Sequence, residues 1–72
     1  MKGDETKKRA EYFLAEGSKV HIGLTSGRFY NGKIVKIEND LLIINDDKLG
    51  ELPIWFSQIK EDGIEPFKEA GA

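Results

Sequence analysis

The chain contains no cysteine, so neither disulfide bonds nor thiolate metal ligands are available to it. His21 is its only histidine, and we therefore expect no metal site and no cofactor. Long apolar segments are also missing, because the longest aliphatic run covers only residues 41–44 and is far too short to cross a bilayer. The N-terminal segment MKGDETKKRAEY lacks the apolar stretch of a signal peptide. We expect a cytoplasmic protein that makes no membrane contact.

The length of 72 residues allows one domain, residues 1–72, with a small core. A chain of this size without disulfides or a metal is marginally stable alone, which leaves oligomerisation as the available source of extra stability. The net charge is −2, yet residues 1–33 carry +3 and residues 34–72 carry −5. This asymmetry predicts either a basic face on a net-acidic protein or an uneven distribution of charge over a solvated surface.

Hydrophobic periodicity predicts one helix followed by five strands. Ala10 and Phe13 share an apolar stripe at helical spacing, Asp4 or Thr6 can cap the helix, and Gly17 can end it. After Gly17 the apolar residues recur with a period of two. The predicted helix covers residues 5–16, the strands cover residues 19–25, 28–37, 41–45, 51–56 and 59–65 within a sheet over residues 19–66, and residues 68–72 form a flexible tail.

Two glycines, Gly27 at its entry and Gly32 in its interior, mark the second predicted strand. A glycine inside a strand indicates a bulge, a bend or the close approach of another backbone, and we interpret Gly32 as the point where this strand bends. The predicted fold is mainly β, an N-terminal helix followed by a strongly bent five-stranded antiparallel sheet that forms an SH3-like open barrel. Pro53 places the fourth strand at an edge, and Asp62 and Gly63 predict an interruption of the fifth.

The segment KVHIGLTSGRFYNGKIVKIENDLLIINDD resembles the first motif of the Sm and Sm-like proteins. Gly27, Gly32 and Ile34 match the glycine and aliphatic positions of that motif, while Ile37 and Glu38 stand where the family usually has an aromatic residue and an aspartate. The resemblance covers roughly residues 5–66. It implies a homo-oligomeric ring, closed by pairing of strand four with strand five of the next copy, that binds single-stranded and often uridine-rich RNA.

The base pocket that the resemblance implies is altered in this sequence. Leu42 replaces the asparagine of the family, Asp40 stands at its base-stacking position, and Trp55 and Phe56 stand at its arginine–glycine pair. The tyrosine–lysine–histidine signature of the Hfq branch is also absent. Leucine cannot make the amide hydrogen bonds that a uridine edge needs, and a carboxylate repels phosphate. The resemblance therefore predicts the fold without predicting this pocket.

Other side chains can replace the altered pocket. Tyr30 and Trp55 are candidate platforms for base stacking, and the alternative for Trp55 is a place in the core or in a subunit interface. His21 is predicted to lie at the surface or in an interface rather than to act in catalysis. The residues predicted to contact phosphate are Lys7, Lys8, Arg9, Arg28 and Lys33.

Three classes of function follow from these features. The first is an Sm-like ring that binds single-stranded RNA through a divergent site. The second is a homo-oligomeric Sm-like scaffold for protein–protein interaction without nucleic-acid binding. An enzyme is disfavoured, because one histidine, no cysteine and no nucleotide-binding glycine loop leave few groups for chemistry.

Overall fold

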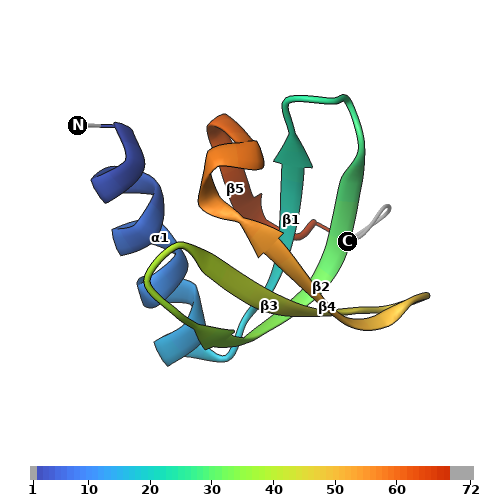
Figure 1. The fold of residues 1–72 in the computed structure, drawn as a ribbon. Coiled ribbons are helices and arrows are strands. Elements are labelled where there is room, and N and C mark those ends of the chain that lie inside the picture. The colour runs from blue at the N-terminus through green and yellow to red at the C-terminus, as the bar shows by residue number, and fades with distance from the viewer. Residues whose placement is uncertain (1, 69–72) are drawn as a thin grey trace.

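The computed structural model describes residues 2–68 and shows one helix followed by a single five-stranded antiparallel sheet (Figure 1). The strand order across the sheet is β4-β3-β2-β1-β5. The predicted fold class is therefore confirmed. The elements are α1 (Lys2–Glu16), β1 (Lys19–Leu24), β2 (Phe29–Ile37), β3 (Leu41–Asp46), β4 (Gly50–Trp55), the 3-10 helix η1 (Phe56–Gln58) and β5 (Ile59–Pro66).

The element boundaries differ from the predicted ones mainly at the helix start. α1 begins at Lys2, so Asp4 and Thr6 lie inside the helix and do not cap it. No proline stands in this segment to prevent the extra helical turn, and the capping preference of Asp and Thr is too weak to end a helix. At the other end, Gly17 has a φ of +68°, a left-handed conformation that ends the helix where expected. The predicted flexible tail falls largely on residues 69–72, which lie outside the described residues.

Gly27 and Gly32 are each required for a different structural reason. Gly27 has a φ of +93° in the turn between β1 and β2, a backbone conformation that favours glycine. Gly32 is required by the close approach of β3, since a methyl group at this position would collide with the carbonyl oxygen of Asn45 and lie 2.7 Å from its carbon. The register between β2 and β3 shifts between Ile34 and Lys36, two residues beyond Gly32. Gly32 thus permits the tight approach of the strands, and the irregularity lies further along β2.

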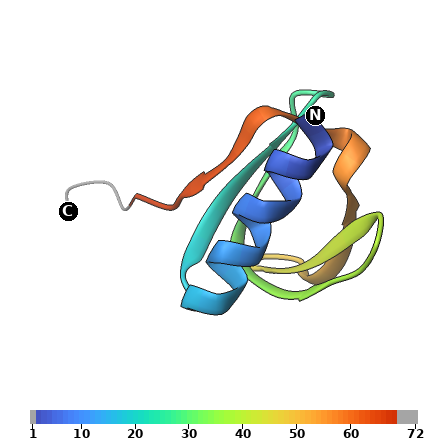
Figure 2. The same ribbon diagram turned by 90° about the vertical axis from the view of Figure 1, so that its left-hand side faces the viewer.

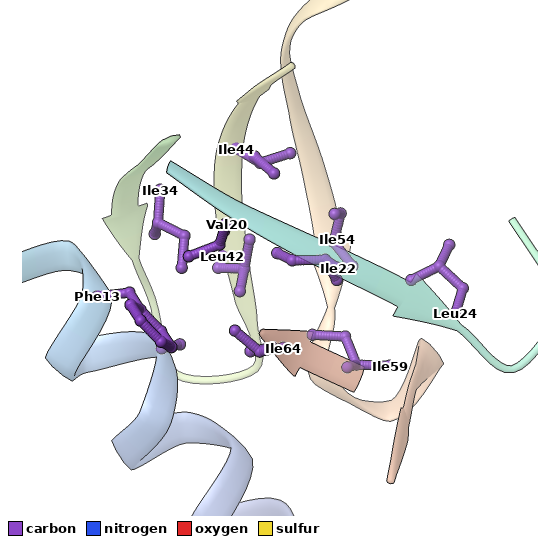
Figure 3. Packing of buried hydrophobic residues seen from close by; sticks show 11 residues of the cluster. Phe13, Val20, Ile22, Leu24, Ile34, Leu42, Ile44, Ile54, Ile59 and Ile64 are labelled. Carbon is purple, nitrogen blue, oxygen red and sulfur yellow. The ribbon is translucent and has the colours of Figure 1, made fainter. Parts of the chain in front are cut away.

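The core lies between α1 and the concave side of the sheet (Figures 2 and 3). The helix contributes Ala10 and Phe13, and it packs against β2, β5 and η1. Ile34 is buried, and Ile37 packs against the core from the end of β2. The buried apolar residues are Ala10, Phe13, Val20, Ile22, Leu24, Ile34, Leu42, Ile44, Ile54, Ile59 and Ile64. No helix among residues 2–68 has the length and apolar character needed to span a membrane.

The strands β4 and β5 form the two edges of the sheet. Pro53 lies on the edge strand β4, which agrees with the prediction made from its missing N–H. The predicted interruption of β5 is also present, because Asp62 has a φ of +57° and the register with β1 shifts between Ile22 and Leu24. Each edge strand has one partner within the chain and leaves its other side open.

Candidate nucleic-acid surface

The position of the family's base pocket is acidic in this structure. Leu42 is fully buried in the core and cannot reach a ligand. The loop after β2 and the end of β4 lie together, since the N–H of Phe56 donates to the carbonyl of Asp40 at 2.9 Å. A shallow hollow of about 450 Å³ opens here, and its lining residues are Glu38, Asn39, Asp40, Leu41 and Trp55. Trp55 is 49% exposed, but two carboxylates beside it oppose the approach of phosphate.

The basic residues of α1 do not share one face. Consecutive helical residues are about 100° apart around the axis, so Lys7, Lys8 and Arg9 point in three directions. Lys8 is exposed and Lys7 is half-buried. The Nε–H of Arg9 donates to the carbonyl of Ile64 at 2.5 Å, and its guanidinium lies 5.7 Å from the centroid of the Phe13 ring. Arg9 therefore links α1 to β5. Lys7 and Lys8 are the two predicted helix residues whose ammonium groups can contact a ligand.

A second surface is formed by the outward side chains of β1 and β2, here called the outer face. Antiparallel pairing sets Lys19 opposite Lys33 and His21 opposite Asn31, and it sets the backbone of Gly23 opposite Phe29. The alternate residues of both strands, such as Val20 and Ile22, point into the core. Tyr30 belongs to the inward set and is half-buried against the core, and it also lines the hollow beside Phe29 and Asn31. The residues of the outer face are Lys19, His21, Phe29, Asn31 and Lys33.

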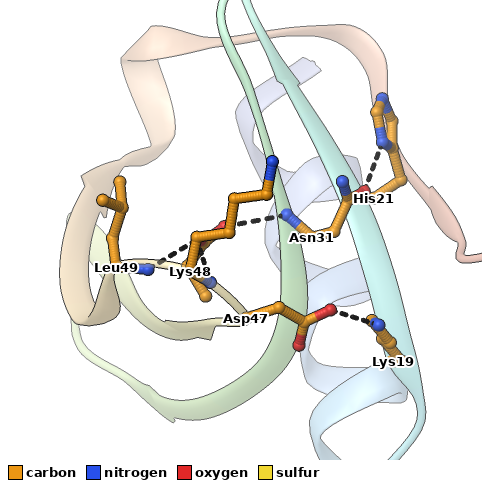
Figure 4. A network of polar contacts seen from close by, with 7 residues as sticks. Lys19, His21, Asn31, Asp47, Lys48 and Leu49 are labelled. Carbon is orange, nitrogen blue, oxygen red and sulfur yellow. Dashed lines mark hydrogen bonds and ion pairs between the residues drawn. The ribbon is translucent and has the colours of Figure 1, made fainter.

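An aromatic pair occupies the middle of the outer face. The rings of His21 and Phe29 lie 5.1 Å apart with an interplanar angle of 31°, and Phe29 is 59% exposed. The Nδ1–H of His21 donates to Oδ1 of Asn31 over 2.6 Å, which fixes the orientation of both polar groups (Figure 4). A hollow of about 360 Å³ adjoins Phe29 and Asn31, and its other wall is formed by Leu49 and Phe67. An exposed ring beside an amide is suited to stacking on a base and contacting its edge.

The turn between β3 and β4 is held against the outer face by Asp46. The carboxylate of Asp46 accepts hydrogen bonds from the N–H groups of Lys48 at 2.9 Å, Leu49 at 3.0 Å and Asn31 at 3.1 Å. The N–H of Lys48, followed by those of Leu49 and Asn31, lowers the pKa of Asp46 below its ordinary value, against the opposing effect of partial burial. Asp46 thereby positions the backbone of Lys48 and Leu49 (Figure 4). Both residues line the hollow.

Basic side chains surround this aromatic centre. Lys33 is exposed, Lys48 lines the hollow, and Arg28 directly precedes Phe29. The side chain of Lys60 crosses over Gly23, where its Cε would lie 2.9 Å from an added methyl group. Lys19 is neutralised in part by an ion pair with Asp47, and its ammonium also lies 4.1 Å from the centroid of the Phe67 ring.

The structure places the predicted residues in separate regions. Arg28 and Lys33 lie on or beside the outer face, while Lys7, Lys8 and Arg9 lie on α1 and Trp55 lies at the acidic hollow. Sequence reasoning did not select Phe29, Asn31, Lys48 and Lys60, which lie on or beside the candidate surface. The alternation of Phe29 and Asn31 with the inward residues of β2 was an available signal for the first two. Within the described part of the chain, no cluster of three or more His, Asp or Glu side chains could hold a metal ion.

The element order and sheet topology are those of the Sm-like fold, which confirms the fold that the resemblance implied. A solved structure with the same fold is the crystal structure of the pleiotropic translational regulator Hfq, to which this chain is similar with a TM-score of 0.68 and 20% sequence identity. The similarity covers 78% of this chain and 92% of that chain. No family model matches the sequence, and no curated protein matches it.

Proposed function

We propose that this protein forms a homo-oligomeric ring that binds single-stranded RNA on the outer face of β1 and β2. The observation that carries the proposal is the exposed Phe29 ring, which lies beside the His21–Asn31 pair and among lysine side chains. Aromatic stacking with backbone phosphate contacts is the usual way in which proteins bind single strands without strong sequence preference. The Sm-like fold supports this class of function by analogy.

Basic side chains support the same surface. Lys33, Lys48 and Lys60 lie around the aromatic pair. Lys7 and Lys8 lie on α1, on the core side of the sheet, and form a separate set of proposed phosphate contacts.

Carboxylates also lie at this face: Glu65 of β5 stands opposite His21, Asp47 pairs with Lys19, and Asp46 accepts hydrogen bonds from three backbone N–H groups. The phosphate contacts proposed here therefore rest on the individual ammonium groups of Lys33, Lys48 and Lys60.

The ring is supported by the edges of the sheet. β4 and β5 each have an open side, and unpaired edges favour pairing with another copy. The outward side chains of β3 and β4 are largely apolar, with Leu41 opposite Trp55 and Ile43 opposite Pro53. An apolar outer surface on an edge strand is typical of an interface, and we assign Trp55 to subunit contact rather than to base stacking.

Fluorescence anisotropy with labelled oligo-U, oligo-A and the equivalent DNA strands, titrated with salt, tests the RNA proposal. We expect binding that weakens with salt at a log–log slope of roughly −0.7 per phosphate contacted. Oligo-U affinity should lie within about tenfold of the other strands, because phosphate contacts and stacking discriminate poorly between bases. Strong uridine preference that survives high salt would contradict the proposed site.

Two matched pairs of variants locate the surface. Phe29→Ala should weaken binding by about fivefold or more, since stacking contributes about 1–3 kcal/mol per base. Tyr12→Ala, which removes an aromatic ring of the same 59% exposure from α1, should leave affinity unchanged. Lys33→Ala should reduce both affinity and salt slope, whereas Lys36→Ala should not, because Lys36 pairs with Glu38 at 3.1 Å.

The scaffold function is the alternative, and a specific observation favours it. Several large apolar side chains are exposed, among them Leu49 at 68% and Trp55 at 49%. Such residues serve protein interfaces as well as they serve nucleic acids. Absence of binding to every strand at low salt would contradict RNA binding and support the scaffold.

A further inference from the structure

Asn31 is the polar group best placed to contact a base on the outer face, and its orientation is fixed on three sides. Its backbone N–H donates to Oδ1 of Asp46 at 3.1 Å, and its carbonyl accepts the N–H of Asp47 at 2.9 Å. Its side-chain Oδ1 accepts the Nδ1–H of His21 at 2.6 Å. Among residues 2–68, the Nδ2 amino group is left without a protein partner.

The imidazole of His21 thus determines which end of the Asn31 amide is available. The His21 ring lies against Phe29, at 5.1 Å between centroids, so it is held in place on the outer face. With Oδ1 turned toward the imidazole, the side chain presents a hydrogen-bond donor to a ligand. Asn31 lines the hollow beside Phe29, where a base stacked on that ring would lie.

The exposed Nδ2 group of Asn31 determines which bases this side chain can hydrogen-bond. An asparagine that recognises adenine uses both ends of its amide, since Oδ1 accepts from the N6 amino group while Nδ2 donates to N7. Here Nδ2 is the end presented to the base, so it can donate to a ring nitrogen of adenine but meets the N6 amino group donor against donor. The carbonyl oxygens of guanine and uracil, in contrast, accept a hydrogen bond from Nδ2.

We propose that the His21–Asn31 pair makes the outer face selective for bases that present a carbonyl oxygen, and that it disfavours adenine. Asn31 contacts the base, and His21 is a positioning residue that holds the amide. The inference rests on the proposed RNA binding, and it adds a specificity to it. The expected preference is about three- to tenfold, the effect of one net hydrogen bond, which lies within the modest overall discrimination expected of this surface.

Inosine isolates the interaction. Its base has the size of adenine, but a carbonyl oxygen replaces the N6 amino group and N1 carries a hydrogen, so the Asn31 and His21 variants are needed to assign any difference to the amide. Anisotropy titrations at one salt concentration should compare an adenosine nonamer with the same nonamer carrying inosine at alternate positions. We expect the inosine strand to bind about three- to tenfold more tightly to the unmodified protein.

Three variants assign the preference to the pair. Asn31→Ala should abolish the preference while Phe29 still supports binding, and His21→Ala should abolish or reverse it, because the released amide can turn Oδ1 toward adenine. His21→Gln should retain part of the preference, since a glutamine amide can donate to Oδ1 of Asn31. This rescue separates a positioning role from a general loss of structure, which far-UV circular dichroism checks for each variant.

The outcomes separate this inference from the proposed function. Equal affinity for the two strands, or tighter binding of the adenosine strand, would overturn the inference and leave RNA binding in place. A preference that persists in Asn31→Ala would also overturn it. Absence of binding to both strands would overturn the proposed function and the inference together.

Discussion

Asp46 illustrates how one side chain supports the surface proposed to bind RNA. Its carboxylate joins the turn after β3 to β2 through three backbone N–H groups. These donors stabilise the ionised form, so the pKa of Asp46 is lower in the folded protein than its ordinary value of 3.8. A depressed folded pKa gives stability that is present above the unfolded pKa and is lost as pH falls through the folded pKa.

We therefore expect Asp46→Asn to be less stable than the unmodified protein at pH 7, and the difference to shrink as pH falls below about 4. Thermal unfolding followed by circular dichroism between pH 7 and pH 2 measures this. Asp40→Asn, which removes a carboxylate from the exposed turn before β3, is the control and should leave the unfolding temperature at pH 7 close to that of the unmodified protein. A difference between Asp46→Asn and the unmodified protein that stays constant over the whole range would contradict the assignment.

Gly32 and Gly23 form a matched pair for the steric role of glycine. A methyl group at position 32 meets the Asn45 backbone, which cannot move without shifting β3, so Gly32→Ala should lower the free energy of unfolding by about 2–3 kcal/mol. At position 23 the methyl meets only the flexible end of Lys60, and Gly23→Ala should cost less than about 1 kcal/mol. Urea unfolding measures both, and equal losses would show that the β2–β3 approach is not the constraint.

At the scale of elements, α1 combines two roles on different faces. Ala10 and Phe13 are buried against the sheet, whereas Lys8 is exposed and Lys7 lies at the border. The Arg9 side chain is engaged with Ile64, so its removal would mix a binding effect with a packing effect. A test of the helix as a phosphate contact must therefore leave Arg9 unchanged.

The double variant Lys7→Ala/Lys8→Ala should weaken the binding of all single strands alike. Its log–log salt slope should become shallower by about 0.7 for each phosphate that the helix no longer binds. Because neither side chain reads a base edge, the ratio between the inosine and adenosine strands should stay unchanged. Anisotropy at several salt concentrations measures both quantities, and an unaltered slope would exclude the helix from phosphate binding.

At the scale of the whole molecule, the sheet ends in two open edges, and the proposed ring closes them. Light scattering at micromolar concentration should give a mass that is a multiple of 8.1 kDa. Trp55→Glu should reduce that mass, because it sets a carboxylate in the apolar outer surface of β4. Leu49→Glu, at a more exposed position on the turn, should leave the mass unchanged. A monomer in the unmodified protein would contradict the ring.

Much of the fold could be predicted because its signals are local. The change of period after Gly17, the missing N–H of Pro53 and the Asp62–Gly63 pair each act on a few neighbouring residues. The helix start was predicted too late for the same reason, since Asp4 and Thr6 are good caps locally but the helix continues through them. Local propensity determines the type of an element better than it determines its end.

The sequence by itself determined the order of helix and strands and the edge position of β4, because hydrophobic spacing and the missing N–H of Pro53 act directly on the backbone. It also determined that the base pocket of the Sm-like proteins is altered, because that depends on residue identity alone. Only the tertiary structure decided which side chains meet. Asn31 and Asp46 are 15 residues apart, and His21 meets Asn31 only through the register of β1 with β2. A register shift of one residue would turn these side chains to the other side of the sheet, so their contact depends on the closure of the whole sheet around its core.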